Sequence, residues 1–359
     1  MTYDPFTRGD APVGVMSREL RDSARDRTLP VEIWYPTTEA QRGRDVDAAT
    51  QDQYDPVPAK PSWGVPLVPQ AAVRDAPLRD SGGRLPGVLF SHGFGAHRRQ
   101  STDFCTHLAS HGYVVASLDH IGNTFMDLMD FSSMPPVFAP VSLAVMKQLA
   151  ADRPADMSLL LDELLAGQLG IAAGRLDPQR VGMTGHSFGG WTTLVTTARD
   201  SRIVAALPLA PGGGRMPEAN PINDALADEP ALDDGRPVPT LMLVAERDAV
   251  LPLENMRGLF ERLSQPKRML ILHNAGHFFF NDSIESTHEL MRASLAATTP
   301  MPPIGQLCSP ASAEAFLRGM GTAHMDAHLK DMQPAIDLLA SDLHAVLASH
   351  DVKIEIVDD

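Results

Sequence analysis

GHSFGG, residues 185–190, is the stretch that most constrains the fold of this chain. It contains the pattern Gly-x-Ser-x-Gly with Ser187 at its centre, which is short enough to occur by chance, so its surroundings decide its meaning. Residues 180–184 predict a strand and residues 188–198 predict a helix. A sharp strand-to-helix turn presents a serine hydroxyl at the carboxyl end of a sheet, which is the setting of a nucleophile elbow.

Short apolar strands alternate with amphipathic helices on both sides of this turn. Such alternation is typical of βαβ units and predicts a mostly parallel sheet covered by helices on both faces. The predicted strands are residues 31–35, 85–90, 113–118, 180–184, 204–209, 240–244 and 268–272, and the predicted helices are residues 101–112, 153–167, 188–198 and 253–263. Near the end, the stripe Ile336, Leu339, Leu343 and Val346 predicts a helix over 333–349, and residues 352–357 alternate like a short strand.

A serine hydroxyl is a weak nucleophile and needs a base to take its proton. At a nucleophile elbow of this kind, the partners follow in the order serine, acid, histidine. Asp248 comes just after the strand 240–244, and His277 comes just after the strand 268–272. We therefore expect His277 to accept the Ser187 proton and Asp248 to orient the imidazole and stabilise its charged form.

Two neighbouring residues are rivals for these roles. Glu246 lies two residues before Asp248 and could be the acid, and His273 could be the base although it sits at a strand end. Another place for the acid is the segment after the strand 204–209. That segment reads LPLAPGG and carries no carboxylate, which favours Asp248.

The loop after the strand 85–90 is the candidate second half of an oxyanion hole. It reads LFSHGFGAHRR, and this loop supplies one backbone N–H donor in enzymes with such an elbow. We assign that donor to Phe94, and the other to Phe188 directly after the serine. His92 is expected to be structural, and Arg98 and Arg99 are expected to be surface charges.

The composition of the chain argues against several classes of binding partner. The chain has 30 basic and 45 acidic residues, a net charge of −15, which disfavours nucleic acid and anionic membranes. There is no His-Glu-x-x-His motif, and the two cysteines, Cys105 and Cys308, form no Cys-x-x-Cys pair, so we expect no metal. The N-terminus lacks a basic start and an apolar run, and no apolar run approaches membrane length, so a soluble cytoplasmic protein is expected.

Two segments interrupt the strand–helix alternation. Residues 37–83 are rich in proline, aspartate and glutamine and predict a long loop excursion. Residues 121–153 are rich in methionine and phenylalanine, which suits either more core or a cap-like pocket wall. On the second interpretation, the candidate pocket residues are Met126, Phe131 and Met146.

Several stretches together resemble a known family. LPVEIWYPT (29–37), LFSHGFGAHR (89–98), LASHGYVVASLDHIGNT (108–124), RPADMSLLLDEL (153–164) and RVGMTGHSFGGWTTL (180–194) resemble the platelet-activating-factor acetylhydrolase-like and dienelactone-hydrolase-like branch of the α/β-hydrolases. ERDAVLP (246–252) and AGHFFF (275–280) are similar to the acid and base segments of cutinase-like polyester hydrolases and dienelactone hydrolases. The resemblance covers roughly residues 29–280 and implies the α/β-hydrolase fold, a serine-hydrolase triad and no cofactor.

The chain also departs from these relatives. Dienelactone hydrolases use a cysteine nucleophile where this chain has Ser187, and LPLAPGG lacks the acid that some acetylhydrolases carry one strand earlier. We expect one α/β-hydrolase domain over residues 1–359 that hydrolyses carboxylic esters of short to medium acyl chains through an acyl-enzyme on Ser187. Alternatives are a lactone, a phospholipid acetyl ester or a polyester as substrate, or a binding protein without catalysis.

Overall fold

A computed structural model describes residues 3–56, 66–80, 82–130, 137–215 and 221–358. Within these ranges, ten strands form one sheet in the order β14-β13-β12-β11-β10-β6-β7-β2-β1-β5. Their bounds are β1 Val13–Asp22, β2 Arg27–Pro36, β5 Val73–Arg74, β6 Leu85–Ser91, β7 Val114–Leu118, β10 Leu176–His186, β11 Ile203–Leu209, β12 Thr240–Ala245, β13 Lys267–Leu272 and β14 Ile354–Asp358. The six strands from β7 to β13 in this order are mutually parallel, while β2 and β14 join them antiparallel. This is the α/β-hydrolase fold.

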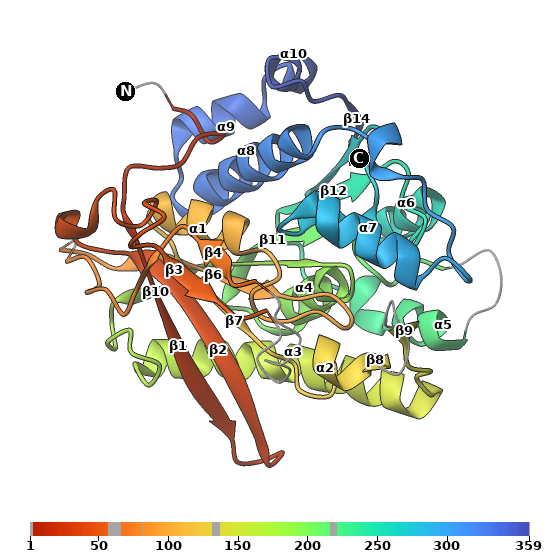
Figure 1. Cartoon of the computed structure of the whole chain (residues 1–359), viewed down its shortest axis with the longest axis horizontal. Helices are drawn as coiled ribbons and strands as arrows, with labels where there is room; N and C mark the ends of the chain where they lie inside the picture. The colour runs from red at the N-terminus through yellow and green to blue at the C-terminus, as the bar shows by residue number, and fades with distance from the viewer. Residues whose placement is uncertain (1–2, 57–65, 81, 131–136, 216–220, 359) are drawn as a thin grey trace.

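Helices cover both faces of the sheet (Figure 1). Their bounds are α1 Thr102–Ser110, α2 Phe125–Leu128, α3 Leu143–Ala166, α4 Phe188–Arg199, α5 Pro221–Ala227, α6 Leu253–Arg262, α7 Ile284–Ser294, α8 Pro310–Leu329, α9 Gln333–Leu339 and α10 Leu343–Ala348. The side chains of β10 point alternately to the two faces of the sheet. Val181 and Met183 pack in the cluster that holds Leu160, Leu161 and Leu164 of α3. Gly182 between them faces α8 instead, where an added Cβ would lie 2.8 Å from Met325 Sδ.

All seven strands and four helices predicted around the elbow are present, with shifted ends. The largest shift is in α3, which begins at Leu143 because the Ser142 hydroxyl accepts from Val145 N (3.3 Å) and caps the helix there. The strand β1 and the helix α8 were not predicted. Both fill the core: Val13 and Phe316 are fully buried.

The predicted loop excursion at 37–83 contains regular structure in its described part. It forms a short 3-10 helix, Glu39–Gln41, and the pair of strands β3 Asp52–Tyr54 and β4 Val68–Gln70. Gln70 accepts a hydrogen bond from the indole of buried Trp34 on β2 (2.7 Å). This polar segment is therefore attached to the β1–β2 end of the sheet.

The segment 121–153 consists of α2, the first part of α3 and a two-stranded ribbon between them. The ribbon pairs β8 Met129–Asp130 with β9 Val137–Phe138. The predicted pocket residue Phe131 lies outside the described residues. None of the helices in the described ranges is both long and apolar enough to cross a membrane.

The C-terminal prediction of one helix over 333–349 is wrong. The helix is broken into α9 and α10, because the Asp342 carboxylate accepts from Ala345 N (3.2 Å) and starts a new helix. Leu343 is buried as predicted, whereas Ile336 is 40% exposed. The alternating residues 352–357 do form a strand, β14, which pairs antiparallel with β13.

Candidate active site

Ser187 occupies the sharp turn between β10 and α4. Its backbone angles are φ 58° and ψ −115°, which a residue with a Cβ rarely adopts and which the surroundings must enforce. Ser187 N donates to Leu209 O (2.9 Å), and Ser187 O accepts from Trp191 N and Gly212 N (3.1 and 3.0 Å). The turn thus has the strained geometry of a nucleophile elbow.

The two glycines of the pattern are needed for close approach. A Cβ on Gly189 would lie 1.8 Å from Ser91 O, and one on Gly185 would lie 2.5 Å from the same atom. Since Ser91 ends β6, the glycines let the elbow pack directly against the start of the candidate oxyanion loop.

Asp248 and His277 come together just beyond the ends of β12 and β13. His277 Nδ1 donates to Asp248 Oδ2 (2.5 Å), and both side chains are buried. The other carboxylate oxygen accepts from Val250 N and Leu251 N (2.8 and 2.7 Å). Because Nδ1 is committed to the acid, Nε2 is the ring nitrogen of His277 that remains for proton transfer.

His277 lies against the elbow through the residue before the serine. The rings of His186 and His277 have centroids 4.6 Å apart, and His186 Nε2 donates to His277 O (2.8 Å). Among the described residues, this hydrogen bond joins the elbow to His277, and Ser187 Oγ forms no hydrogen bond. Catalytic hydrogen bonds are often long before substrate binds and shorten in the substrate complex.

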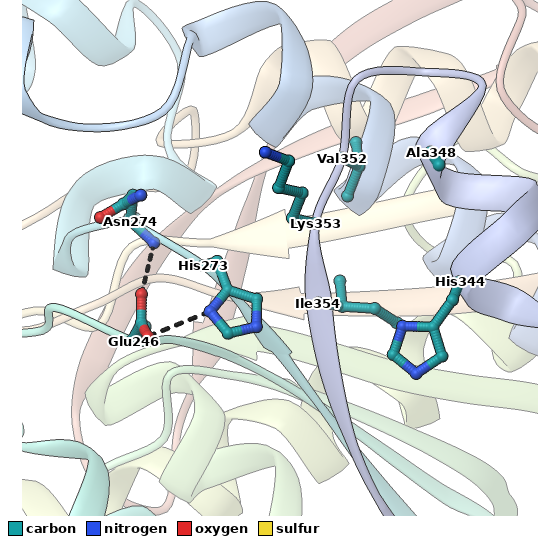
Figure 2. A pocket seen from close by; sticks show the side chains of 8 residues that line it. All are labelled: Glu246, His273, Asn274, His344, Ala348, Val352, Lys353 and Ile354. Atoms are coloured by element: carbon teal, nitrogen blue, oxygen red, sulfur yellow. Dashed lines mark hydrogen bonds and ion pairs between the residues drawn. The ribbon is translucent and has the colours of Figure 1, made fainter.

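The rival acid and base pair with each other instead. Glu246 Oε1 accepts from His273 Nδ1 (3.0 Å) and Oε2 accepts from Asn274 N (2.7 Å), as Figure 2 shows. Burial works to raise the pKa of Glu246, but these two hydrogen bonds, together with the neighbouring His273 and Arg247 charges, outweigh it and lower the pKa. Glu246 and His273 line a cavity of about 540 Å³ together with His344 and Lys353.

The candidate oxyanion loop lies beside the serine. A Cβ on Gly93 would be 3.5 Å from Ser187 Cβ, and the rings of Phe94 and Phe188 have centroids 6.5 Å apart. Phe188 is the first residue of α4, so its N–H is one of those without an acceptor inside the helix. Phe94 in the loop after β6 and Phe188 at the start of α4 therefore lie on two different segments beside the serine.

A buried arginine that no motif in the sequence indicated fixes the start of this loop. Arg153 is fully buried on α3 and donates to Thr192 Oγ1 (2.9 Å), to Ser91 Oγ (3.1 Å), to His92 O and to Asn123 Oδ1. Burial lowers the pKa of Arg153 to about 9, although the Asp156 carboxylate acts to raise it. The guanidinium is therefore charged at neutral pH. Only the fold reveals this role, because Arg153 lies far from the loop in sequence.

A chain of buried hydrogen bonds also begins at Ser91. Ser91 Oγ donates to His120 Nε2 (3.0 Å), and His120 Nδ1 donates to Asp156 Oδ2 (2.9 Å). All three residues are fully buried. These three residues are bonded in the Ser–His–Asp order of a catalytic triad. Because they are fully buried, we assign them a structural role beneath the loop after β6.

The expectation that Arg98 and Arg99 are surface charges is wrong. Their side chains are 18% and 13% exposed, and both form ion pairs with buried Glu32 (3.7 and 2.9 Å). Arg98 also pairs with Asp119. They fix the loop to β2 because a buried carboxylate has to be paired.

The candidate pocket residues separate in the structure. Met126 is half-buried on the short helix α2. Met146 is 5% exposed and belongs to the core cluster that also holds Phe188 and Trp191. Met146 is thus a residue of the hydrophobic core.

Two family models match the chain. The model described as PET hydrolase-like matches residues 77–296, and the model described as platelet-activating factor acetylhydrolase, isoform II, matches residues 8–126. The first match includes the elbow, Asp248 and His277. The second ends shortly after β7 and includes the loop of Phe94.

Curated relatives cover part of the chain. A platelet-activating factor acetylhydrolase from Cavia porcellus is 26% identical, over 52% of this chain and 48% of its own length. Cutinase est1 from Thermobifida alba is 28% identical over 48% and 46%. A bis(hydroxyethyl) terephthalate hydrolase from Streptomyces coelicolor is 28% identical over 58% and 55%. The chain spans about half the length of the curated relatives it matches.

A solved structure is similar over nearly the whole chain. The ferulic acid esterase from Streptomyces cinnamoneus superposes with a TM-score of 0.63 at 25% identity, covering 90% of this chain and 91% of that one. The PET hydrolase-like model matches well over half of the 359 residues. The chain therefore has the α/β-hydrolase fold and belongs to the PET hydrolase-like family.

Proposed function

We propose that this protein hydrolyses carboxylic esters through an acyl-enzyme on Ser187. The observation that carries the proposal is the 2.5 Å hydrogen bond from His277 to Asp248, made beside a serine held at positive φ. The relatives named above are an acetylhydrolase, a cutinase, a terephthalate ester hydrolase and a ferulic acid esterase, which supports the same chemistry here.

In the proposed mechanism, His277 Nε2 takes the proton of Ser187 Oγ as that oxygen attacks the ester carbonyl carbon. Asp248 holds the imidazole through Nδ1 and stabilises its charged form. The N–H groups of Phe94 and Phe188 donate to the developing oxyanion, a kind of contact whose removal costs about 3–4 kcal/mol of barrier lowering in other hydrolases.

The tetrahedral intermediate that this attack forms then collapses. The ester C–O bond breaks as His277 gives its proton to the leaving alcohol. A water molecule gives a proton to His277 as its oxygen attacks the acyl carbon of the Ser187 ester. The bond from the acyl carbon to Ser187 Oγ then breaks, His277 returns the proton to that oxygen, and the carboxylic acid leaves. The residues proposed for this cycle need no metal or cofactor.

We propose an ester of short to medium acyl chain as the substrate, bound as a small-molecule or lipid-like ligand. Lactones, phospholipid acetyl esters and polyester fragments share the mechanism and are the alternatives. A panel with one member of each class separates them, with bis(hydroxyethyl) terephthalate as the polyester fragment. The cytoplasmic location stays a prediction, which fractionation of the source cells would check.

The experiment is hydrolysis of p-nitrophenyl acetate, butyrate, octanoate and palmitate by the wild type and by Ser187→Ala. We expect turnover that disappears in Ser187→Ala and persists in Ser201→Ala, which removes an exposed serine hydroxyl. The preferred chain length then measures the acyl site. A folded wild type that neither hydrolyses these esters nor reacts with a fluorophosphonate would instead be a binding protein.

A further inference from the structure

One buried amide touches all three loops of the proposed site. Gln100 lies just before α1 and is 8% exposed. Its side chain bonds to the backbone N–H of Gly93 in the oxyanion loop (2.6 Å), to His186 Nδ1 at the elbow (2.7 Å) and to Asn281 Oδ1 after the His277 segment (2.7 Å).

The chemistry of the partners sets the orientation of this amide. A backbone N–H can only donate, so the atom facing Gly93 is the oxygen Oε1. Nε2 therefore faces His186 and Asn281, and its two hydrogens match two acceptors, His186 Nδ1 and Asn281 Oδ1.

The same reasoning sets the tautomer of His186. Its Nδ1 accepts from Gln100, and its Nε2 must carry the hydrogen, because the partner there is the carbonyl oxygen of His277 (2.8 Å). Burial lowers the pKa of His186, as does the neighbouring His277, so the ring is neutral. A continuous chain of donors and acceptors thus runs from Gly93 through Gln100 and His186 to the backbone of His277.

We propose that Gln100 is the positioning residue that sets the oxyanion loop and the catalytic histidine relative to each other around Ser187. It reaches His277 through His186 and touches neither the substrate nor the reacting atoms. This inference rests on the proposed ester hydrolysis. Its physical basis is that reacting groups misplaced by about 1 Å can lose 10²-fold in rate.

Other contacts also join the segment of Gln100 to the segment after His277. The effect of Gln100 on positioning can therefore be tested separately from its effect on folding. Ser101 Oγ donates to Phe280 O (3.0 Å), and Asp282 N donates to Gln100 O (3.1 Å). The Asp282 carboxylate also accepts from Thr102 N and Oγ1 at the start of α1 (2.6 and 2.5 Å). None of these bonds uses the Gln100 side chain, so we expect its replacement to leave the loop attached and to release Gly93 and His186.

The test is Gln100→Met, which keeps the length of the side chain and removes its donors and acceptor. Active sites are counted with a fluorophosphonate, and kcat and KM for p-nitrophenyl butyrate are expressed per labelled site. We expect kcat to fall about 10- to 100-fold, while KM stays within about twofold because ground-state binding is unaffected. The matched control is Gln168→Met, which changes an exposed glutamine after α3 and should leave both constants unchanged.

A second measurement tests whether Gln100→Met weakens the stabilisation of the transition state. The inhibition constant of a phenylboronic acid, which forms a tetrahedral adduct on the serine, should rise by the factor by which kcat/KM falls. His186→Phe should reduce kcat as well. The double variant with Gln100→Met should lose little more than the larger single effect, because both residues act through one chain.

Several results would overturn the role of Gln100. One is Gln100→Met with wild-type kcat per labelled site, and others are a change confined to KM or fully additive effects with His186→Phe. A wild type that neither labels nor hydrolyses esters would remove the proposed function itself, which is a different result. Should Gln100→Met not fold, the ¹⁵N shifts of His186 in the wild type decide: we expect a bare Nδ1 and a protonated Nε2, and the other tautomer contradicts the proposal.

Discussion

The guanidinium carbon of Arg153 lies 4.4 Å from the centre of the Phe188 ring, so a buried cation sits against the residue that follows the serine. Arg153 also donates to Ser91 and His92, which lead into the oxyanion loop. One side chain of α3 therefore contacts both halves of the proposed oxyanion hole.

Removal of this cation should destabilise the protein strongly. Arg153→Met leaves the acceptors of Ser91, His92, Asn123 and Thr192 without a buried donor, and we expect a loss of about 3–5 kcal/mol in the free energy of unfolding. Urea denaturation followed by circular dichroism measures this. Arg44→Met, a change of an exposed arginine, should stay within about 0.5 kcal/mol; an equal effect of both changes would contradict the assigned role.

Asp248→Asn should abolish most activity through a change of tautomer. The N–H groups of Val250 and Leu251 require an acceptor, so the amide oxygen would take their side and the NH₂ group would face His277. His277 would then carry its hydrogen on Nε2 and could not accept the serine proton. We expect kcat to fall about 10³- to 10⁴-fold with little change in melting temperature.

Glu246→Gln is the matched control for this change, since Glu246 bonds to His273 and Asn274. Its kcat should stay within about threefold of the wild type. A larger loss in Glu246→Gln than in Asp248→Asn would reverse the assignment of the acid.

Replacement of glycine by alanine should have opposite effects on stability at Gly189 and at Gly258. Gly189→Ala should inactivate and destabilise the protein, because the new Cβ would meet the Ser91 carbonyl oxygen at 1.8 Å. Gly258→Ala in α6 meets nothing within 4 Å and should raise the free energy of unfolding by about 0.5–1 kcal/mol, because alanine is the better helix former. Melting temperature and labelling by a fluorophosphonate check both; labelled, stable Gly189→Ala would refute the close approach.

The stability at low pH should depend on His107. Burial lowers the pKa of His107 to about 3, with His111 adding to the effect, while the unfolded value is near 6.5. Because the folded pKa is the lower one, the unfolded chain binds the proton first, and stability is lost as the pH falls below 6.5. At pH 5, this single group should cost about 2 kcal/mol relative to pH 8.

The comparison is His107→Gln, which keeps an N–H donor for Pro5 O but does not titrate. Urea denaturation at pH 8 and pH 5 should show a smaller loss of stability in the variant, by about 2 kcal/mol. Parallel losses in the two proteins would mean that His107 takes up its proton in the folded state.

Local patterns in the sequence were enough for the elbow and the strand–helix alternation. GHSFGG follows an apolar strand and opens a helix, and both elements depend on neighbouring residues, so their positions were predicted to within a few residues. Asp248 and His277 could also be chosen as candidates, because each follows a predicted strand and the carboxyl ends of parallel strands meet at one edge of the sheet.

The tertiary structure decided what depends on residues far apart in the chain. It paired Glu246 with His273 and Asp248 with His277, a choice between neighbours that no local pattern could make. It also placed Gln100 between the three loops, with Gly93 nearby in sequence but His186 and Asn281 86 and 181 residues away. The reason is physical: strand and helix signals are local, whereas the partners of a buried polar group are chosen by the packing of the whole sheet and its helices.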